Sequence, residues 1–182
     1  MLALLAGALI GTACSTDDSH LRSDWERENE GRLAKAEASL TDVSMPAPPR
    51  EADLVEFEAG AGASEFRFFV DRRSISVTDE GIVRYSLIAR SPNGVSNVTY
   101  EALSCREREV LVHATGRPDG TWSAAQPTWR PIARPWHRAL LREYFCPKGL
   151  PIMSAEEGAV ALAQGGHALS RPPNPVSGGG GP

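Results

Sequence analysis

The residues best suited to chemistry in this sequence are arginines that recur at four-residue steps in its C-terminal third. They are Arg130, Arg134, Arg138 and Arg142. Residues four apart share one stripe of a helix, and guanidinium groups bind phosphate or carboxylate in a bidentate way, so the spacing predicts an anion-binding patch. The interpretation that we favour over such a patch is that these arginines cover the solvated side of a packed helix and pair with nearby glutamates, namely Glu143, Glu107 or Glu109.

Two cysteines, Cys105 and Cys146, are candidates for a disulfide once Cys14 is assigned to an anchor. In an oxidising compartment such a pair bridges, and closing a loop of about 42 residues would stabilise the fold by roughly 4 kcal/mol. Two unpaired core thiols are one alternative. A catalytic thiol is another, but it needs a positioned base, and the sequence places neither His113 nor His137 beside a cysteine.

The N-terminal segment 1–13 is uncharged, consists largely of small and apolar residues, and ends at Cys14. A helix needs about 20 apolar residues to cross a bilayer, so this shorter run predicts the apolar region of a signal peptide; a buried core helix is the alternative. The small residues 11–13 before the cysteine resemble a bacterial lipobox, although Gly11 stands where leucine is usual. We expect a lipid on Cys14 that holds the chain to a membrane, with plain cleavage nearby as the alternative.

Familiar catalytic and metal-binding signatures are missing from the sequence. It contains no G-x-S-x-G elbow, no phosphate-binding G-x-x-x-x-G-K, no H-E-x-x-H and no C-x-x-C. The histidines, at His20, His113, His137 and His167, are too scattered to predict a metal site, and nothing predicts a cofactor. The tryptophans Trp122, Trp129 and Trp136 could form a ligand platform or simply pack in the core.

Composition sets the organisation of the chain. A hydrophobic fraction of 41% with 23% charged residues allows one core. Residues 14–50 are charged, small and proline-punctuated, which predicts a lipid-anchored tether with a marginal helix from about Asp24 to Leu40. Residues 51–166 are predicted to form the globular domain. The proline- and glycine-rich segment 167–182 is predicted to be a disordered tail.

From Leu54 to Thr115, apolar and polar residues alternate in short runs separated by turn signals, a pattern typical of antiparallel strands. Strands are predicted at 66–70, 74–77, 82–90, 95–105 and 110–115. Asn93-Gly94 is a strong hairpin signal because both residues tolerate positive φ. The pattern therefore predicts a meander of about five strands.

Prolines after Trp122 argue against a strand or helix before Trp136. Beyond that point apolar residues recur at three- and four-residue steps, which predicts a helix ending at Pro147. Its predicted buried stripe is His137, Leu140, Leu141, Tyr144 and Phe145. A second short helix is predicted at 155–164, capped by Ser154. The predicted fold is α+β: an antiparallel meander with a C-terminal helix packed on it.

Several segments are similar to an uncharacterised bacterial family, the CNP-like family. They are Asp24-Trp25-Glu26, Ser74-Ile75-Ser76-Val77, Gly81 to Leu87, Asn97 to Glu101, Cys105, Asp119-Gly120-Thr121-Trp122 and Tyr144-Phe145-Cys146. The resemblance spans about two thirds of the chain. It implies a periplasmic or lipoprotein location and offers no catalytic residues to carry over.

Together these features predict a non-enzymatic envelope lipoprotein that acts as a binding or scaffold module. We expect it in the periplasm, lipid-anchored at the inner face of the outer membrane, since Ser15 follows the cysteine. Its expected partners are the membrane itself and an anionic envelope component or envelope protein. Nucleic acid is not expected, because an exported chain with a net charge of -4 meets little of it. The alternative is an enzyme or enzyme-accessory subunit whose site no motif reveals.

Overall fold

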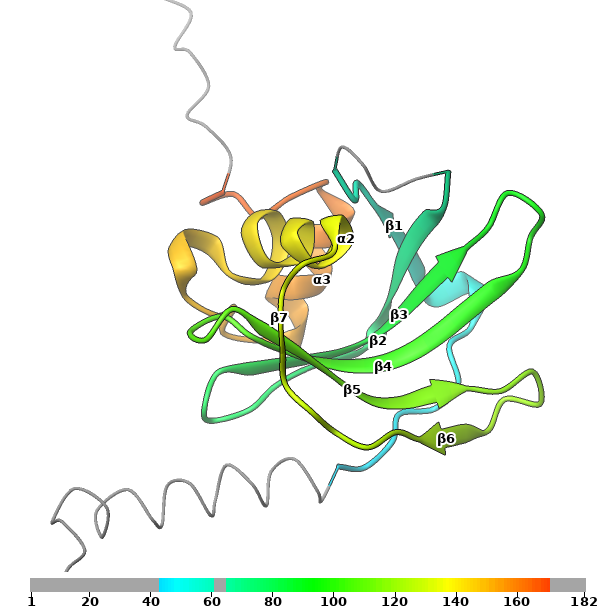
Figure 1. Cartoon of the computed structure of the whole chain (residues 1–182). Helices are drawn as coiled ribbons and strands as arrows, with labels where there is room; N and C mark the ends of the chain where they lie inside the picture. Colours follow the sequence, from blue (N-terminus) through cyan, green and yellow to red (C-terminus); the bar gives the residue numbers. More distant parts are fainter. Residues whose placement is uncertain (1–42, 61–64, 171–182) are drawn as a thin grey trace, which may run out of the picture. The chain divides into compact units, whose positions relative to one another are not determined.

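The computed structural model describes residues 43–60 and 65–170 (Figure 1). The predicted signal peptide, Cys14 and the predicted tether helix lie outside these residues. Within them, no helix is both long enough and apolar enough to cross a membrane.

A single antiparallel sheet forms the body of the domain (Figure 1). Its strands are β1 Leu54–Phe57, β2 Arg67–Val77, β3 Ile82–Arg90, β4 Ser96–Ser104, β5 Glu109–Gly116, β6 Trp122–Ala124 and β7 Arg130–Pro131. They pair in chain order from β1 to β6, and β7 also pairs with β5. The predicted meander and the α+β class are therefore confirmed, with two strands more than the five expected.

Glycines at the hairpin turns explain why the strands reverse where they do. Gly94 has φ +82° and donates its N–H to the carbonyl of Ser91, and Ser91 in turn is bonded to Val95. This is the turn that Asn93-Gly94 predicted between β3 and β4. Gly81, with φ +78°, plays the same part between β2 and β3.

Two details of the predicted sheet were wrong. The runs predicted at 66–70 and 74–77 belong to one strand, β2, whose register against β3 shifts between Asp71 and Ser76. Ser74 holds this irregularity together, because its hydroxyl donates to the Asp71 carbonyl and accepts the Ser86 N–H. The proline-rich stretch after Trp122 also contains strands, and Pro131 is tolerated in β7 because that strand has two residues and pairs only with β5.

Helical segments cover one face of the sheet (Figure 1). They are the α-helix α2 Pro135–Ala139, the π-helical segment η3 Leu140–Phe145, the 3-10 turn η4 Pro147–Gly149 and the α-helix α3 Ala155–Ala163. A further 3-10 turn, η2 Glu51–Asp53, lies apart from them and leads into β1 (Figure 1). The predicted C-terminal helix is α2 continued by η3, and all five residues of its predicted stripe are buried. The predicted cap of α3 is confirmed, because the Ser154 hydroxyl accepts the Glu157 N–H.

The core lies between these helices and the sheet. Tyr85 and Val83 of β3 are fully buried, and the Tyr85 ring packs 5.2 Å from the ring of Phe145, measured between centroids. Gly158 of α3 sits so close to the core that a β-carbon there would lie 2.7 Å from the Cδ1 atom of Ile152. Close packing on the sheet therefore explains why α3 carries a glycine in its interior.

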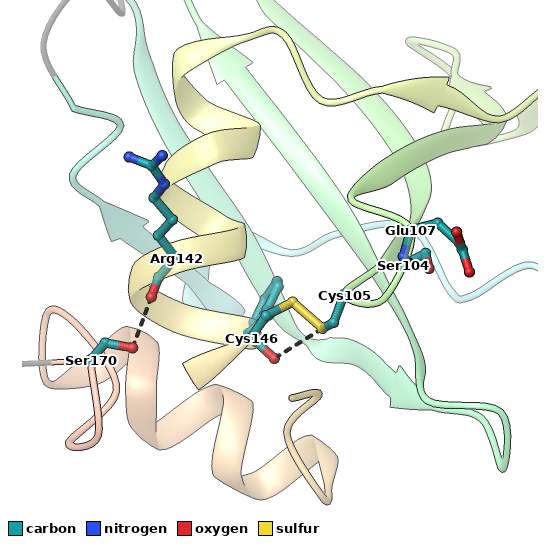
Figure 2. The surroundings of a disulfide bond; sticks show 7 residues. Ser104, Cys105, Glu107, Arg142, Cys146 and Ser170 are labelled. Carbon is teal, nitrogen blue, oxygen red and sulfur yellow. Dashed lines mark hydrogen bonds between the residues drawn. A yellow bond between two sulfur atoms is a disulfide. The ribbon is translucent and has the colours of Figure 1, made fainter. Parts of the chain in front are cut away.

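A disulfide joins Cys105, at the end of β4, to Cys146, at the end of η3 (Figure 2). The two Cα atoms are 5.6 Å apart, and both residues are buried. The predicted pairing is thus confirmed, and it ties the sheet to its covering helix.

The ordered chain continues past the predicted end of the domain. His167, which the sequence placed in the tail, is buried, and its Nε2 atom lies 2.8 Å from an oxygen of Glu157. Ser170 donates its hydroxyl hydrogen to the carbonyl of Arg142 (Figure 2). Residues 171–182 lie outside the described part.

Candidate functional site

A row of polar residues on β4 lies on the face of the sheet that carries the helices. In the register with β3, Asn97, Thr99 and Glu101 lie opposite Ala89, Leu87 and Tyr85. Because side chains alternate between the faces of a sheet, all of these project toward the face that carries the core. Glu101 is only 3% exposed, which is unusual for a carboxylate and requires partners.

Three side chains donate hydrogen bonds to the Glu101 carboxylate. Thr99 reaches Oε1 at 2.7 Å, while the Tyr85 hydroxyl at 3.1 Å and His137 Nε2 at 2.9 Å both reach Oε2. Burial raises the pKa of Tyr85 well above its usual value, and the negative charge of Glu101 raises it further, so Tyr85 stays protonated and donates. Both oxygens of Glu101 are therefore satisfied.

His137 connects this buried carboxylate to the helix layer. It lies in α2, and because a carboxylate can only accept, Nε2 is the ring nitrogen that carries the hydrogen. The Nδ1 atom has no hydrogen-bond partner among the described residues. In the tautomer that carries its hydrogen on Nε2, the Nδ1 atom offers a lone pair that can accept a hydrogen bond or a proton.

These polar groups line one end of a cavity of about 550 Å³ between α2 and strands β2 to β4. We call it the Glu101 pocket; its lining residues are Phe66, Phe68, Leu87, Ala89, Asn97, Thr99, Glu101, Arg134, Pro135, Trp136 and His137. The Phe68 and Trp136 rings stack with centroids 4.8 Å apart and form an aromatic wall. The volume and the mixture of apolar walls with a few polar groups are typical of small-molecule sites.

The lining residues differ in exposure, which gives the pocket a floor and a mouth. Glu101 and His137 are buried, Trp136 is half-buried, and Asn97 and Arg134 are exposed. The Arg134 guanidinium lies 5.7 Å from the centroid of the Trp136 ring, within cation–π range. Arg134 forms no ion pair with another described residue.

A known protein family matches the part of the chain that contains most of these strands and helices. The family model described as the CNP1-like family matches residues 34–163, which include every strand and α2. The chain belongs to the CNP1-like family. Comparisons with curated proteins and with solved structures give no match.

In this CNP1-like chain, the four arginines of the predicted anion-binding patch do not line one cavity. Arg134 is at the Glu101 pocket, whereas Arg138 and Arg142 line a separate cavity of about 320 Å³ that also contains Glu58 and Glu143. Arg130 lies in β7. Figure 2 shows the Arg142 side chain pointing away from the disulfide. The patch stays a prediction.

The tryptophans and the other histidines have separate places. Trp122 donates its indole N–H to the Pro46 carbonyl and lies near Tyr100, which also contacts His113. Of the predicted platform, only Trp136 lines the Glu101 pocket. The described residues contain no cluster of three or more His, Cys, Asp and Glu side chains that could hold a metal ion.

Sequence reasoning missed the pairing of Glu101 with His137. It placed His137 in a buried stripe and Glu101 in a strand, but two residues 36 positions apart carry no local sign of contact. One signal was available: in the alternating pattern of β4, residues 97, 99 and 101 share the face of the apolar residues 83, 85 and 87 of β3. Polar side chains on a core-facing row indicate a cavity or a buried network.

Proposed function

We propose that this chain is a lipid-anchored binding protein of the cell envelope whose Glu101 pocket takes a small, largely apolar molecule. The observation that carries the proposal is the pocket itself, a cavity of about 550 Å³ with an aromatic wall at Phe68 and Trp136 and with hydrogen-bonding groups at one end. Such a site binds through burial of apolar surface, while a few polar groups fix orientation.

The test uses N-phenyl-1-naphthylamine, an uncharged dye whose fluorescence rises in apolar sites. We expect wild-type protein to bind it and Asn97→Trp to weaken binding at least about tenfold, because the indole would fill the mouth of the pocket. Asn97 is exposed and lies in a strand, where tryptophan is well accepted.

Ser96→Trp is the matched control. Ser96 is the preceding residue of β4, is also exposed and faces the other side of the sheet, so this variant should bind the dye as wild type does. Equal binding by the two variants, or no binding by wild type, would contradict the proposal.

The envelope location is supported by the buried disulfide, which suits an oxidising compartment, and by the apolar segment before Cys14. We expect Cys14→Ala to move the protein from the membrane fraction to the soluble fraction, because buried acyl chains contribute about 0.8 kcal/mol for each methylene. Cell fractionation and intact-mass analysis measure this, with Ser15→Ala as the control. Membrane retention of the Cys14→Ala protein would show that a lipid there is not the anchor.

A second candidate is an enzyme or enzyme-accessory role, favoured by the Glu101 and His137 pair. A carboxylate that orients an imidazole is a common arrangement for a general base. The described lining contains no serine or cysteine, and its one threonine, Thr99, donates its hydroxyl hydrogen to Glu101, so the nucleophile of such an enzyme would be a water molecule or Thr99 itself. Recovery of a chemically altered ligand after incubation with the protein would favour this role over simple binding.

A further inference from the structure

The charges around the Glu101 pocket indicate what kind of molecule it accepts, if the binding function proposed above is right. Glu101 is the only carboxylate in the described lining, and Arg134 is the only guanidinium. They differ in position, because Glu101 is buried at the floor and Arg134 is exposed at the mouth. They differ also in whether other groups of the protein hydrogen-bond to them.

The carboxylate at the floor already has protein hydrogen-bond donors on both of its oxygens. Glu101 accepts hydrogen bonds from Thr99, Tyr85 and His137, which leaves little reason for a ligand to bring a cation to it. A cationic ligand would also have to pass Arg134 and would leave that guanidinium unmatched. The floor therefore keeps the negative charge of a carboxylate whose oxygens are already hydrogen-bonded, which favours placing a ligand's acid group at the mouth rather than at the floor.

The positive charge at the mouth is not matched. Arg134 contacts the face of Trp136, and no carboxylate among the described residues pairs with it. The Trp136 ring contacts only the face of the guanidinium. The N–H donors along the guanidinium edge remain available for a carboxylate, sulfonate or phosphate. The Asn97 amide lies at the same mouth and offers further donors.

We propose that the ligand is an amphipathic monoanion whose apolar body lies against Phe68, Leu87 and Trp136 and whose acid group is held by Arg134 at the mouth. Two kinds of molecule fit this description: an alkyl acid, such as a fatty acid, and an aromatic acid. In either case the acid group remains close to solvent, so its charge is not fully desolvated.

The experiment compares two dyes with the same aromatic body. N-phenyl-1-naphthylamine is neutral, and 1-anilinonaphthalene-8-sulfonate adds one negative charge. We expect the protein to bind the sulfonate about fivefold more tightly at low salt, as one partly exposed ion pair gives, and to lose this preference at high salt. Arg134→Gln should abolish the preference, so that the ratio of the two dissociation constants, measured on the same variant, falls to about one.

Arg106→Gln is the matched control, because Arg106 is an exposed arginine that lines a different cavity, so its removal should leave the preference intact. If the neutral dye binds the pocket but the sulfonate has no advantage, or if both arginine variants reduce the advantage equally, the anion inference is wrong and the binding function stands. If the wild-type protein does not bind the neutral dye, or if Asn97→Trp does not weaken that binding, the binding function itself is wrong.

Competition then separates the two sources of the acid. Displacement of the sulfonate dye by decanoate would support an alkyl acid, and displacement by 1-naphthoate an aromatic one. Displacement by neither acid would overturn the inference.

Discussion

Replacing both domain cysteines, with Cys105→Ala and Cys146→Ala, is expected to lower the free energy of unfolding by about 4 kcal/mol. The bridge closes a loop between residues 41 positions apart, so its loss gives the unfolded chain many more conformations. A small domain has a net stability of about 5–15 kcal/mol, so the change removes a large share of it. The effect should be large here because this bond joins the sheet to the helix that covers it.

Urea unfolding at neutral pH measures the difference, with Cys14→Ala present in every protein so that no other thiol interferes. A reducing agent should destabilise the parent protein by the same amount and leave the double alanine variant unchanged. A parent protein that is insensitive to reduction would mean that the bond contributes little to stability. Quantitative alkylation of both cysteines in unreduced parent protein would mean that the bond does not form.

Glu101→Ala is expected to have a similar effect, about 4 kcal/mol of destabilisation. Alanine leaves the Tyr85 hydroxyl, the Thr99 hydroxyl and the His137 N–H without their acceptor, and both Tyr85 and His137 are buried. Each buried donor without a partner costs about 1–3 kcal/mol, and the loss of side-chain volume adds a cavity. The buried carboxylate is therefore expected to matter for the fold as well as for the pocket.

Glu101→Gln should fall between wild type and alanine, because the amide keeps one acceptor oxygen but turns an N–H₂ group toward groups that also donate. Glu107→Ala is the control: its side chain is 64% exposed, so a change within about 0.5 kcal/mol is expected. Urea denaturation of the three variants gives the comparison. A Glu101→Ala protein as stable as the Glu107 variant would show that the three donors find other partners.

Sequence patterns predicted those parts of the fold that depend on local chemistry. The alternation from 82 to 90 defined β3, and the steps of three and four after Trp136 defined the helix whose stripe is buried. The strands that were missed are short or interrupted. β1 has four residues and β7 has two, and the irregularity in β2 that Ser74 supports breaks the period-two pattern.

The candidate site was less predictable for a physical reason. The disulfide could be anticipated by counting cysteines, but the Glu101 pocket is created by the docking of α2 on the sheet. Arg134 was singled out for its spacing with Arg138 and Arg142, whereas its contact with Trp136 at a pocket mouth depends on packing alone. A hydrogen bond such as the one between Glu101 and His137 follows from the tertiary structure, which a single sequence encodes only indirectly.

The order of the strands has a consequence for how the chain reaches this structure. Each strand from β2 to β6 pairs with the one made immediately before it, so the sheet can assemble one hairpin at a time with short loop closures. The helices are made last, yet α3 brings Gly158 against Ile75 of β2, near the beginning of the domain. Until the C-terminal segment has been synthesised and docked, the apolar face of the sheet remains uncovered. The late helices thus complete the nascent domain and end its exposure to aggregation.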